Sequence, residues 1–233
     1  MNNKNRIVLI FFAAVFLFWS CDYGELGGAD KTDTYYPEDA LFKERMDFLC
    51  GNWYSYYAGE RLDGYRIRKW SDFAAEDKAR AKAQFPNLNV DNPKTYSAQA
   101  VTQNSYYIVL YDDTEGNESW GFGFMGLVCA INIFNGDKNC GAIIVEYFEG
   151  ADPLWLSSQG LTRGEKPFFG IYFRVIDSDT VQMANAVNLA AMYAGESYYT
   201  EQGTLDEAVM TFNVENEAEF ISWGVVTPQN REK

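Results

Sequence analysis

The segment YYIVLYDDTEGNESWGFGFMGLVCAINIFNGDKNCGAIIVEYF, residues 106–148, carries the clearest structural pattern of the 233-residue chain. It contains three apolar runs rich in aromatic and β-branched residues, Tyr106–Asp112, Trp120–Ile133 and Ala142–Phe148. Runs of this composition are typical of β-strands, and the Asp, Asn and Gly residues between them favour tight turns. Because short turns join neighbouring antiparallel strands, the segment predicts three consecutive strands of an antiparallel sheet.

The same pattern continues on both sides of this segment. The other predicted strands are Trp53–Tyr57, continuing or resuming at Tyr65–Trp70, then Tyr96–Thr102, Phe168–Ile176, Thr180–Val187 and Phe220–Val226. A meander of eight or nine strands loses its exposed edges most simply by closing into a barrel. The sequence therefore predicts an all-β protein with minor helices, built as an antiparallel up-and-down β-barrel of about eight strands.

Three segments carry helical patterns. A short N-terminal helix is expected from Pro37 to about Leu49, where proline and two acids precede apolar residues at helical spacing. Ser71–Phe85 is alanine-rich with a thin apolar face, which predicts a helical insertion after the first strand that covers an opening. Thr204–Glu207 is a capping box that starts a C-terminal helix over Ala208–Phe212, before a final strand.

Composition excludes several classes of function. The chain has a formal net charge of −14, which opposes binding to nucleic acid, and it has no histidine, which removes imidazole-based triads and His-ligated metals. The acids at Asp112–Glu115 and Asp177–Asp179 are interpreted as solvated turns rather than calcium ligands. We therefore expect neither an enzyme nor a protein that needs a cofactor or metal.

The N-terminus has the pattern of an export signal. Lys4 and Arg6 precede an apolar run, Ile7–Trp19, which is too short to span a bilayer, and Ser20 stands directly before Cys21. This arrangement resembles the lipobox of bacterial lipoproteins. The resemblance implies that residues 1–20 are a signal peptide and that Cys21 carries acyl chains such as palmitate. The alternative is an ordinary signal followed by a buried thiol.

The lipobox resemblance also implies an address and a domain organisation. We expect a lipid-anchored protein of the bacterial cell envelope, with the choice between inner and outer membrane left open. Residues 21–36 are rich in Gly, Asp and Thr and are expected to form an acidic flexible tether. Residues 37–233 then form the β-barrel domain.

The start of the first strand carries a second resemblance. Gly51-Asn52-Trp53-Tyr54 follows a short helix, and it resembles the G-x-W motif of lipocalins and other calycins, whose element order is also similar. The resemblance implies that Gly51 and Trp53 form the plug of the closed end of the barrel and that an arginine covers the tryptophan. Arg231 is the candidate for that arginine. The alternative is that Trp53 is an ordinary core residue.

An eight-stranded barrel is either filled by its own side chains or holds one small ligand. The candidate ligand-binding residues are the rings along the predicted strands: Tyr107, Tyr111, Trp120, Phe122, Phe124 and Phe169. If they line a cavity, the protein binds a small apolar molecule inside the barrel. If they fill the core, the protein binds a protein partner through exposed loops such as Gly150–Lys166, which has an apolar tip.

The remaining cysteines are an odd set for an exported protein. Cys129 and Cys140 lie on the two arms of one predicted hairpin and could form a disulfide, which leaves Cys50 single. A bridge from Cys50 to either of the others is the competing arrangement.

Overall fold

The computed structural model describes residues 30–57, 60–112, 121–151, 163–195 and 200–232. The predicted signal peptide, Cys21, Trp120 and most of the apolar loop tip therefore lie outside the described residues. The side chains of Tyr111 and Phe122, in the strands, also lie outside the description.

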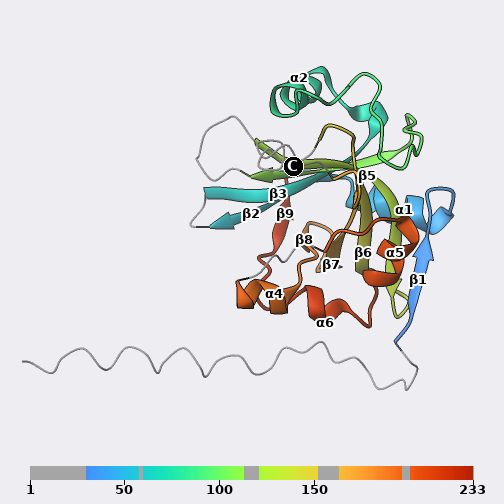
Figure 1. Cartoon of the computed structure of the whole chain (residues 1–233). Helices are drawn as coiled ribbons and strands as arrows, with labels where there is room; N and C mark the ends of the chain where they lie inside the picture. The colour runs from blue at the N-terminus through green and yellow to red at the C-terminus, as the bar shows by residue number, and fades with distance from the viewer. Residues whose placement is uncertain (1–29, 58–59, 113–120, 152–162, 196–199, 233) are drawn as a thin grey trace, which may run out of the picture.

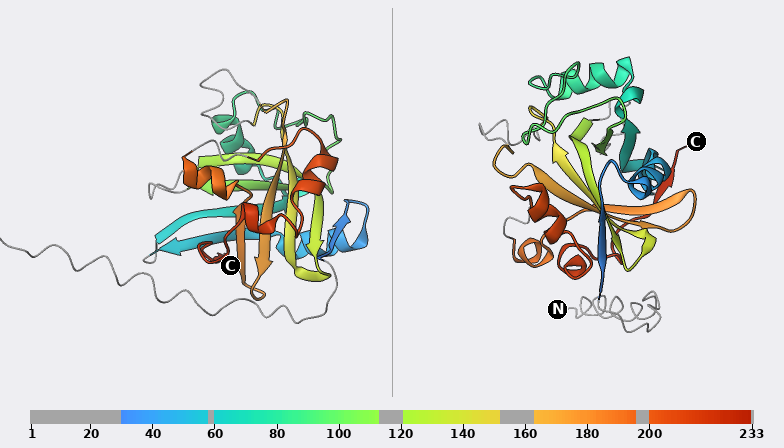
Figure 2. Two further views of the ribbon diagram at one scale, coloured as in Figure 1. Left: turned by 60° about the horizontal axis from the view of Figure 1, so that its bottom comes forward. Right: turned by 90° about the vertical axis from the view of Figure 1, so that its right-hand side faces the viewer.

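Eight antiparallel strands close into a barrel in chain order (Figures 1 and 2). They are β2 Gly51–Tyr57, β3 Glu60–Lys69, β4 Tyr106–Asp112, β5 Gly121–Phe134, β6 Asp137–Tyr147, β7 Phe168–Val175, β8 Thr180–Asn185 and β9 Gln229–Arg231. The short β9 pairs with β8 on one side and with β2 on the other. Together with the pairing of β5 with β6, these contacts close the ring of strands. The predicted up-and-down barrel with minor helices is confirmed.

A ninth strand, β1 (Thr32–Tyr35), branches from this barrel. It pairs with the second half of β5, at Ile131–Phe134, whereas β4 pairs with the first half of β5, at Gly121–Leu127. Residues 32–35 fall in the stretch expected to be a flexible tether, so that expectation is wrong for them. Their alternation of Thr, Asp, Thr and Tyr is too short to predict a strand, and the long β5 supplies the pairing partner.

Helices cover the barrel from outside and at one end. Helix α1 (Ala40–Leu49) precedes β2, and η1 (Trp70–Asp72) with α2 (Ala75–Gln84) follows β3 as the predicted insertion. Along the chain, β8 and β9 are separated by three helices, α4 (Leu189–Ala194), α5 (Leu205–Thr211) and α6 (Glu217–Phe220). The capping box of α5 is present, with Thr204 and Glu207 bonding reciprocally. Among the described residues, no helix combines the length and apolar character needed to cross a bilayer.

Alternation along the strands divides the buried residues into two clusters. The interior cluster combines Trp53 and the inward residues of the strands with Phe42, Met46 and Leu49 of α1. The outer cluster lies between the barrel wall and the helices, and it includes Ala81 of α2 and Phe212 of α5. The wall is therefore apolar on both faces, which explains why its strands read as continuous apolar runs rather than as alternating ones.

Two of the predicted strands are wrong. Tyr96–Thr102 belongs to a long irregular segment, residues 86–105, which runs between α2 and β4; apart from a bridge between Thr95 and Phe148 it has no strand pairing. A turn at Thr95–Ala98, with Ala98 at φ 62°, breaks any extended run. Its neighbours in sequence, β3 and β4, pair directly with each other, so the sheet has no place for it.

Phe220–Val226 is also not a strand, since α6 ends at Phe220 and turns follow. Its aromatic residues pack on the outer face instead of entering the sheet: Phe220 contacts Phe212, and Trp223 lies under Arg174. The carbonyl groups of Trp223 and Val226 accept hydrogen bonds from the side chain of Gln182 in β8 rather than from the backbone of a strand. The final strand is β9, a few residues later.

Two buried polar side chains fasten the outer layer to the wall. Asn132 of β5 donates through Nδ2 to the carbonyls of Val209 and Phe212 at the end of α5, at 2.9 and 2.7 Å. Glu146 of β6, with no exposed surface, accepts hydrogen bonds from the backbone N–H and the hydroxyl of Ser97, at 2.6 and 2.7 Å. Glu146 therefore holds the irregular segment against the barrel.

Candidate functional site

Trp53 lies in the interior cluster together with the buried residues of α1. Its indole Nε1 donates to the carbonyl of Leu49 at 2.8 Å, and its side chain is fully buried. The guanidinium of Arg231 lies 4.2 Å from the ring centre, and it donates to the carbonyls of Phe48 and Cys50. Arg231 therefore lies over Trp53, as the lipocalin resemblance implies, whereas the role of Gly51 and Trp53 as the barrel plug stays a prediction.

The backbone conformation of Gly51 favours glycine at this position. Its φ of 147° is one that side-chain-bearing residues rarely adopt, whereas a Cβ there would make an ordinary contact of 3.4 Å with the guanidinium of Arg231. The glycine therefore lets α1 turn sharply into β2 while the arginine approaches the backbone.

Side chains fill the half of the interior next to Trp53. The exposed fraction is zero for Trp53 and for its neighbours Ile67, Ile108, Ile131, Ile143, Val145, Ile171, Phe173 and Val181. A zero value means that no water-sized space adjoins these side chains. The described side chains in this part of the barrel therefore form a packed core.

Further from Trp53, three rings meet inside the barrel. The ring centre of Phe169 lies 4.8 Å from that of Phe124 and 4.5 Å from that of Tyr147. Their exposed fractions are only 4–5%. Two of the six candidate ligand-binding residues, Phe124 and Phe169, are therefore brought together, and they contact each other.

The other candidates do not join this cluster in the described structure. Tyr107 points outward and packs against Trp70 and Phe73 beneath the insertion. Its prediction as an interior ligand contact is wrong, because the β4 residues on either side of it, Tyr106 and Ile108, take the inward positions. Tyr111 and Phe122 are paired in the backbone of β4 and β5, and their side chains, like Trp120, lie outside the description.

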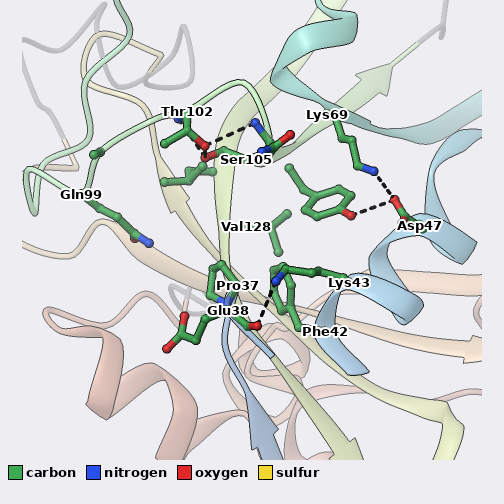
Figure 3. Close-up of a pocket in the computed structure, with 14 residues that line it drawn as sticks. Pro37, Glu38, Phe42, Lys43, Asp47, Lys69, Gln99, Thr102, Ser105 and Val128 are labelled. Carbon is green, nitrogen blue, oxygen red and sulfur yellow. Dashed lines mark hydrogen bonds and ion pairs between the residues drawn. The ribbon is translucent and has the colours of Figure 1, made fainter. Parts of the chain in front are cut away.

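One cavity among the described residues lies in the flank of the barrel (Figure 3). Its volume is about 460 Å³. It opens where β5 changes partner, between the end of its pairing with β4 at Leu127 and the start of its pairing with β1 at Ile131. The lining residues are Pro37, Glu38, Phe42, Lys43, Asp47, Lys69, Gln99, Ala100, Thr102, Asn104, Ser105, Tyr106, Leu127 and Val128. We call this cavity the flank pocket.

Apolar groups line one part of the flank pocket and polar groups the rest. Phe42, Tyr106 and Val128 belong to the interior core, so the base of the pocket is rigid. Gln99, Thr102 and Ser105 supply amide and hydroxyl groups from the irregular segment, and Thr102 and Ser105 bond to each other (Figure 3). The pocket therefore offers an apolar surface beside hydrogen-bonding groups.

The charged groups of the flank pocket are largely engaged with one another. Asp47 receives a hydrogen bond from the hydroxyl of Tyr106 at 2.8 Å and an ion pair from Lys69 at 2.7 Å (Figure 3). Burial, together with Asp47, raises the pKa of Tyr106 to about 12, so the phenol stays protonated. The ammonium of Lys43 donates to the backbone carbonyl of Glu38 at 2.9 Å. Two lysines and two acids leave the lining with no net formal charge.

Sequence reasoning missed this pocket because its wall is assembled from distant segments. The sequence predicts a strand over Tyr96–Thr102, within the irregular segment, and the change of partner along β5 has no local sequence pattern. The polar run from Thr102 to Ser105, between two apolar stretches, is the signal that could have pointed to a surface recess.

The described cysteines are separate thiols. Cys129 lies at a bulge of β5 beside Val145, whereas Cys140 pairs with Arg174 of β7, so the candidate disulfide between them is not formed. Cys50 is also free, at the start of β2. Burial raises the pKa of Cys50 to about 12 and that of Cys140 to about 11, and it raises the pKa of Cys129 well above its usual value.

Within the described residues, no group of three or more Cys, Asp and Glu side chains is arranged to hold a metal ion. Comparisons with protein-family models, with curated proteins and with solved structures find no match to this chain.

Proposed function

We propose that this protein is a lipid-anchored binding protein of the bacterial cell envelope, and that it takes one small ligand in the flank pocket. The observation that carries the proposal is the pocket itself. Its volume of about 460 Å³ lies within the range of small-molecule sites, roughly 300–1,000 Å³. The packed core around Trp53 supports the flank rather than the barrel centre as the site.

The lining favours an uncharged ligand with an apolar body and a polar head. Phe42 and Val128 offer apolar contact, whereas Gln99, Thr102 and Ser105 can donate or accept hydrogen bonds. The ion pair of Lys69 with Asp47 would have to be broken to bind a charged group, and that exchange gives little net gain near a surface.

A binding role rather than a catalytic one is part of the proposal. The chain has no histidine, and the phenol of Tyr106 at the pocket holds its proton with a pKa of about 12. A general base near neutral pH needs a pKa close to the working pH. The cell-envelope address rests on the resemblance of residues 1–21 to a lipoprotein signal.

The test is a pair of matched variants measured with a neutral fluorescent probe, N-phenyl-1-naphthylamine. Ala100→Trp places a large ring at the pocket from an exposed position, and Ala79→Trp places the same ring on the exposed face of α2, away from the lining residues. We expect Ala100→Trp to weaken probe binding at least about tenfold and Ala79→Trp to leave it unchanged. Equal binding by the two variants would contradict a site in the flank pocket.

A third variant separates the flank from the barrel interior. Phe169→Ala removes one of the three rings that meet inside the barrel and leaves the pocket lining intact. If Phe169→Ala changes probe affinity and Ala100→Trp does not, the ligand binds in the interior. Native mass spectrometry of the isolated protein would then identify any molecule that co-purifies.

A further inference from the structure

Helix α4 is an apolar element that contacts α6 and is otherwise largely exposed in the described structure. Its sequence, Leu189–Ala194 (LAAMYA), contains no polar residue apart from the tyrosine hydroxyl, and none of its residues is buried. Tyr193 is 75% exposed and Met192 is 38% exposed. A short helix of this composition would normally place at least one of its large side chains in the core.

The chain segment that contains α4 has no charged side chain, although the neighbouring helix α6 carries Glu217 and Glu219. The chain carries a formal net charge of −14, yet no Asp, Glu, Lys or Arg occurs from Thr180 to Gly195. Asn188 caps the helix by accepting a hydrogen bond from the N–H of Ala191, and Gly195 ends it in a left-handed conformation. The helix is therefore locally well formed although it is exposed.

The position of α4 points to the surface that would cover it. In Figure 1, α4 and the beginning of β1 both lie at the lower side of the molecule. Nine residues, 22–30, join Cys21 to this end of the described chain. At no more than about 3.6 Å per residue they keep an acylated Cys21 within roughly 32 Å of Asp30.

We infer that α4 rests on the bilayer that holds the acylated Cys21, with Tyr193 and Met192 at the lipid interface. The inference rests on the lipid anchor of the proposed function but not on the flank pocket. Tyrosine is suited to such an interface because its ring is apolar and its hydroxyl stays hydrated. The anchor keeps α4 at a high effective concentration near the membrane, so a few exposed apolar side chains are sufficient.

The experiment measures amide hydrogen exchange of the mature acylated protein reconstituted in phosphatidylcholine vesicles. The Cys21→Ser chain, which has no site for the lipid, supplies the exchange rates in solution. We expect exchange at residues 189–195 to slow at least about threefold on the vesicles, whereas exchange in α5, residues 205–211, stays unchanged. A protein partner as the true occupant would leave α4 unprotected on protein-free vesicles, and that result would overturn the inference.

Two matched variants assign the protection to α4. Tyr193→Glu puts a charge at a side chain that is 75% exposed, and Met210→Glu puts one at a side chain of α5 that is 73% exposed. Only Tyr193→Glu should abolish the protection. If mass spectrometry finds no lipid on Cys21, the anchor fails and the inference fails with it. If the lipid is present and α4 exchanges at its solution rate, only the inference fails.

Discussion

The guanidinium of Arg231 lies 4.2 Å from the ring centre of Trp53. The two residues are partners in the pairing of β9, near the end of the chain, with β2, the first strand of the barrel. The same group donates to the carbonyls of Phe48 and Cys50, which lie at the end of α1 and just beyond it. The backbone of β9 therefore closes the ring of strands, and the side chain of Arg231 in the same strand covers Trp53 and donates to two carbonyl groups at the end of α1.

Replacing Arg231 should destabilise the whole barrel. Arg231→Ala removes the cation–π contact and two charge-assisted hydrogen bonds, so we expect the free energy of unfolding to fall by about 2–4 kcal/mol. Arg61→Ala is the matched control, because Arg61 also lies over a ring, that of Tyr54, but pairs with a partly exposed Glu232. It should cost about 1 kcal/mol or less. Urea unfolding measures both, and similar losses would argue against a special role for Arg231.

Asn132 should matter through the direction of its hydrogen bonds. Its Nδ2 donates to two carbonyls of α5, and its Oδ1 accepts from the hydroxyl of Thr34. Asn132→Ala should cost about 2–3 kcal/mol. Asn132→Asp should cost more, because it sets a carboxylate oxygen against two carbonyl oxygens.

The control for this pair is Thr34→Val, which removes only the hydroxyl that donates to Asn132 and should cost about 1 kcal/mol. Thermal unfolding ranks the three variants. An aspartate variant as stable as the alanine variant would show that α5 does not depend on these donors.

Glu146 should make stability depend on pH. Burial raises its pKa, although the hydrogen bonds from Ser97 act in the opposite direction. The folded protein therefore binds a proton more tightly than the unfolded chain, whose glutamate titrates near about 4.3. The contribution of Glu146 to the free energy of unfolding is therefore fully present below that pH and is lost as the pH rises through the raised pKa.

Glu146→Gln should flatten that part of the pH profile, because glutamine keeps hydrogen bonds to Ser97 without titrating. Glu201, whose pKa burial also raises, remains in both proteins, so their difference isolates Glu146. Urea midpoints between pH 4 and 8 give the comparison. If the urea midpoints of the wild type and the variant change with pH in parallel, the prediction is wrong.

The three described cysteines should be unreactive thiols in the native protein. Burial raises the pKa of each above its usual value, and only a thiolate reacts readily. We expect almost no reaction with a thiol reagent at pH 8 before unfolding. After unfolding without a reductant, alkylation should add three groups to a chain whose Cys21 is acylated or replaced by serine. A count of one would reveal a disulfide among Cys50, Cys129 and Cys140.

Patterns along the chain were sufficient for the elements that depend on near neighbours. Continuous aromatic and β-branched runs predict the strands β4–β7, because both faces of the barrel wall are buried there. The capping box of α5 is equally local, because four consecutive residues satisfy its end groups. The closed barrel follows from the count of hairpins rather than from any single contact.

Contacts between distant segments account for what the patterns did not show. The strands β1 and β9 have four and three residues, and each becomes a strand only because a longer one pairs with it. The segment around Ser97 has strand-like residues, but the buried Glu146 holds it outside the sheet. The rings of Phe124 and Phe169 contact each other, so these aromatic residues form packed core. The flank pocket lies where β5 changes its pairing partner. Composition and periodicity specify which residues avoid water, whereas the register of the closed sheet specifies which of them touch and where space is left.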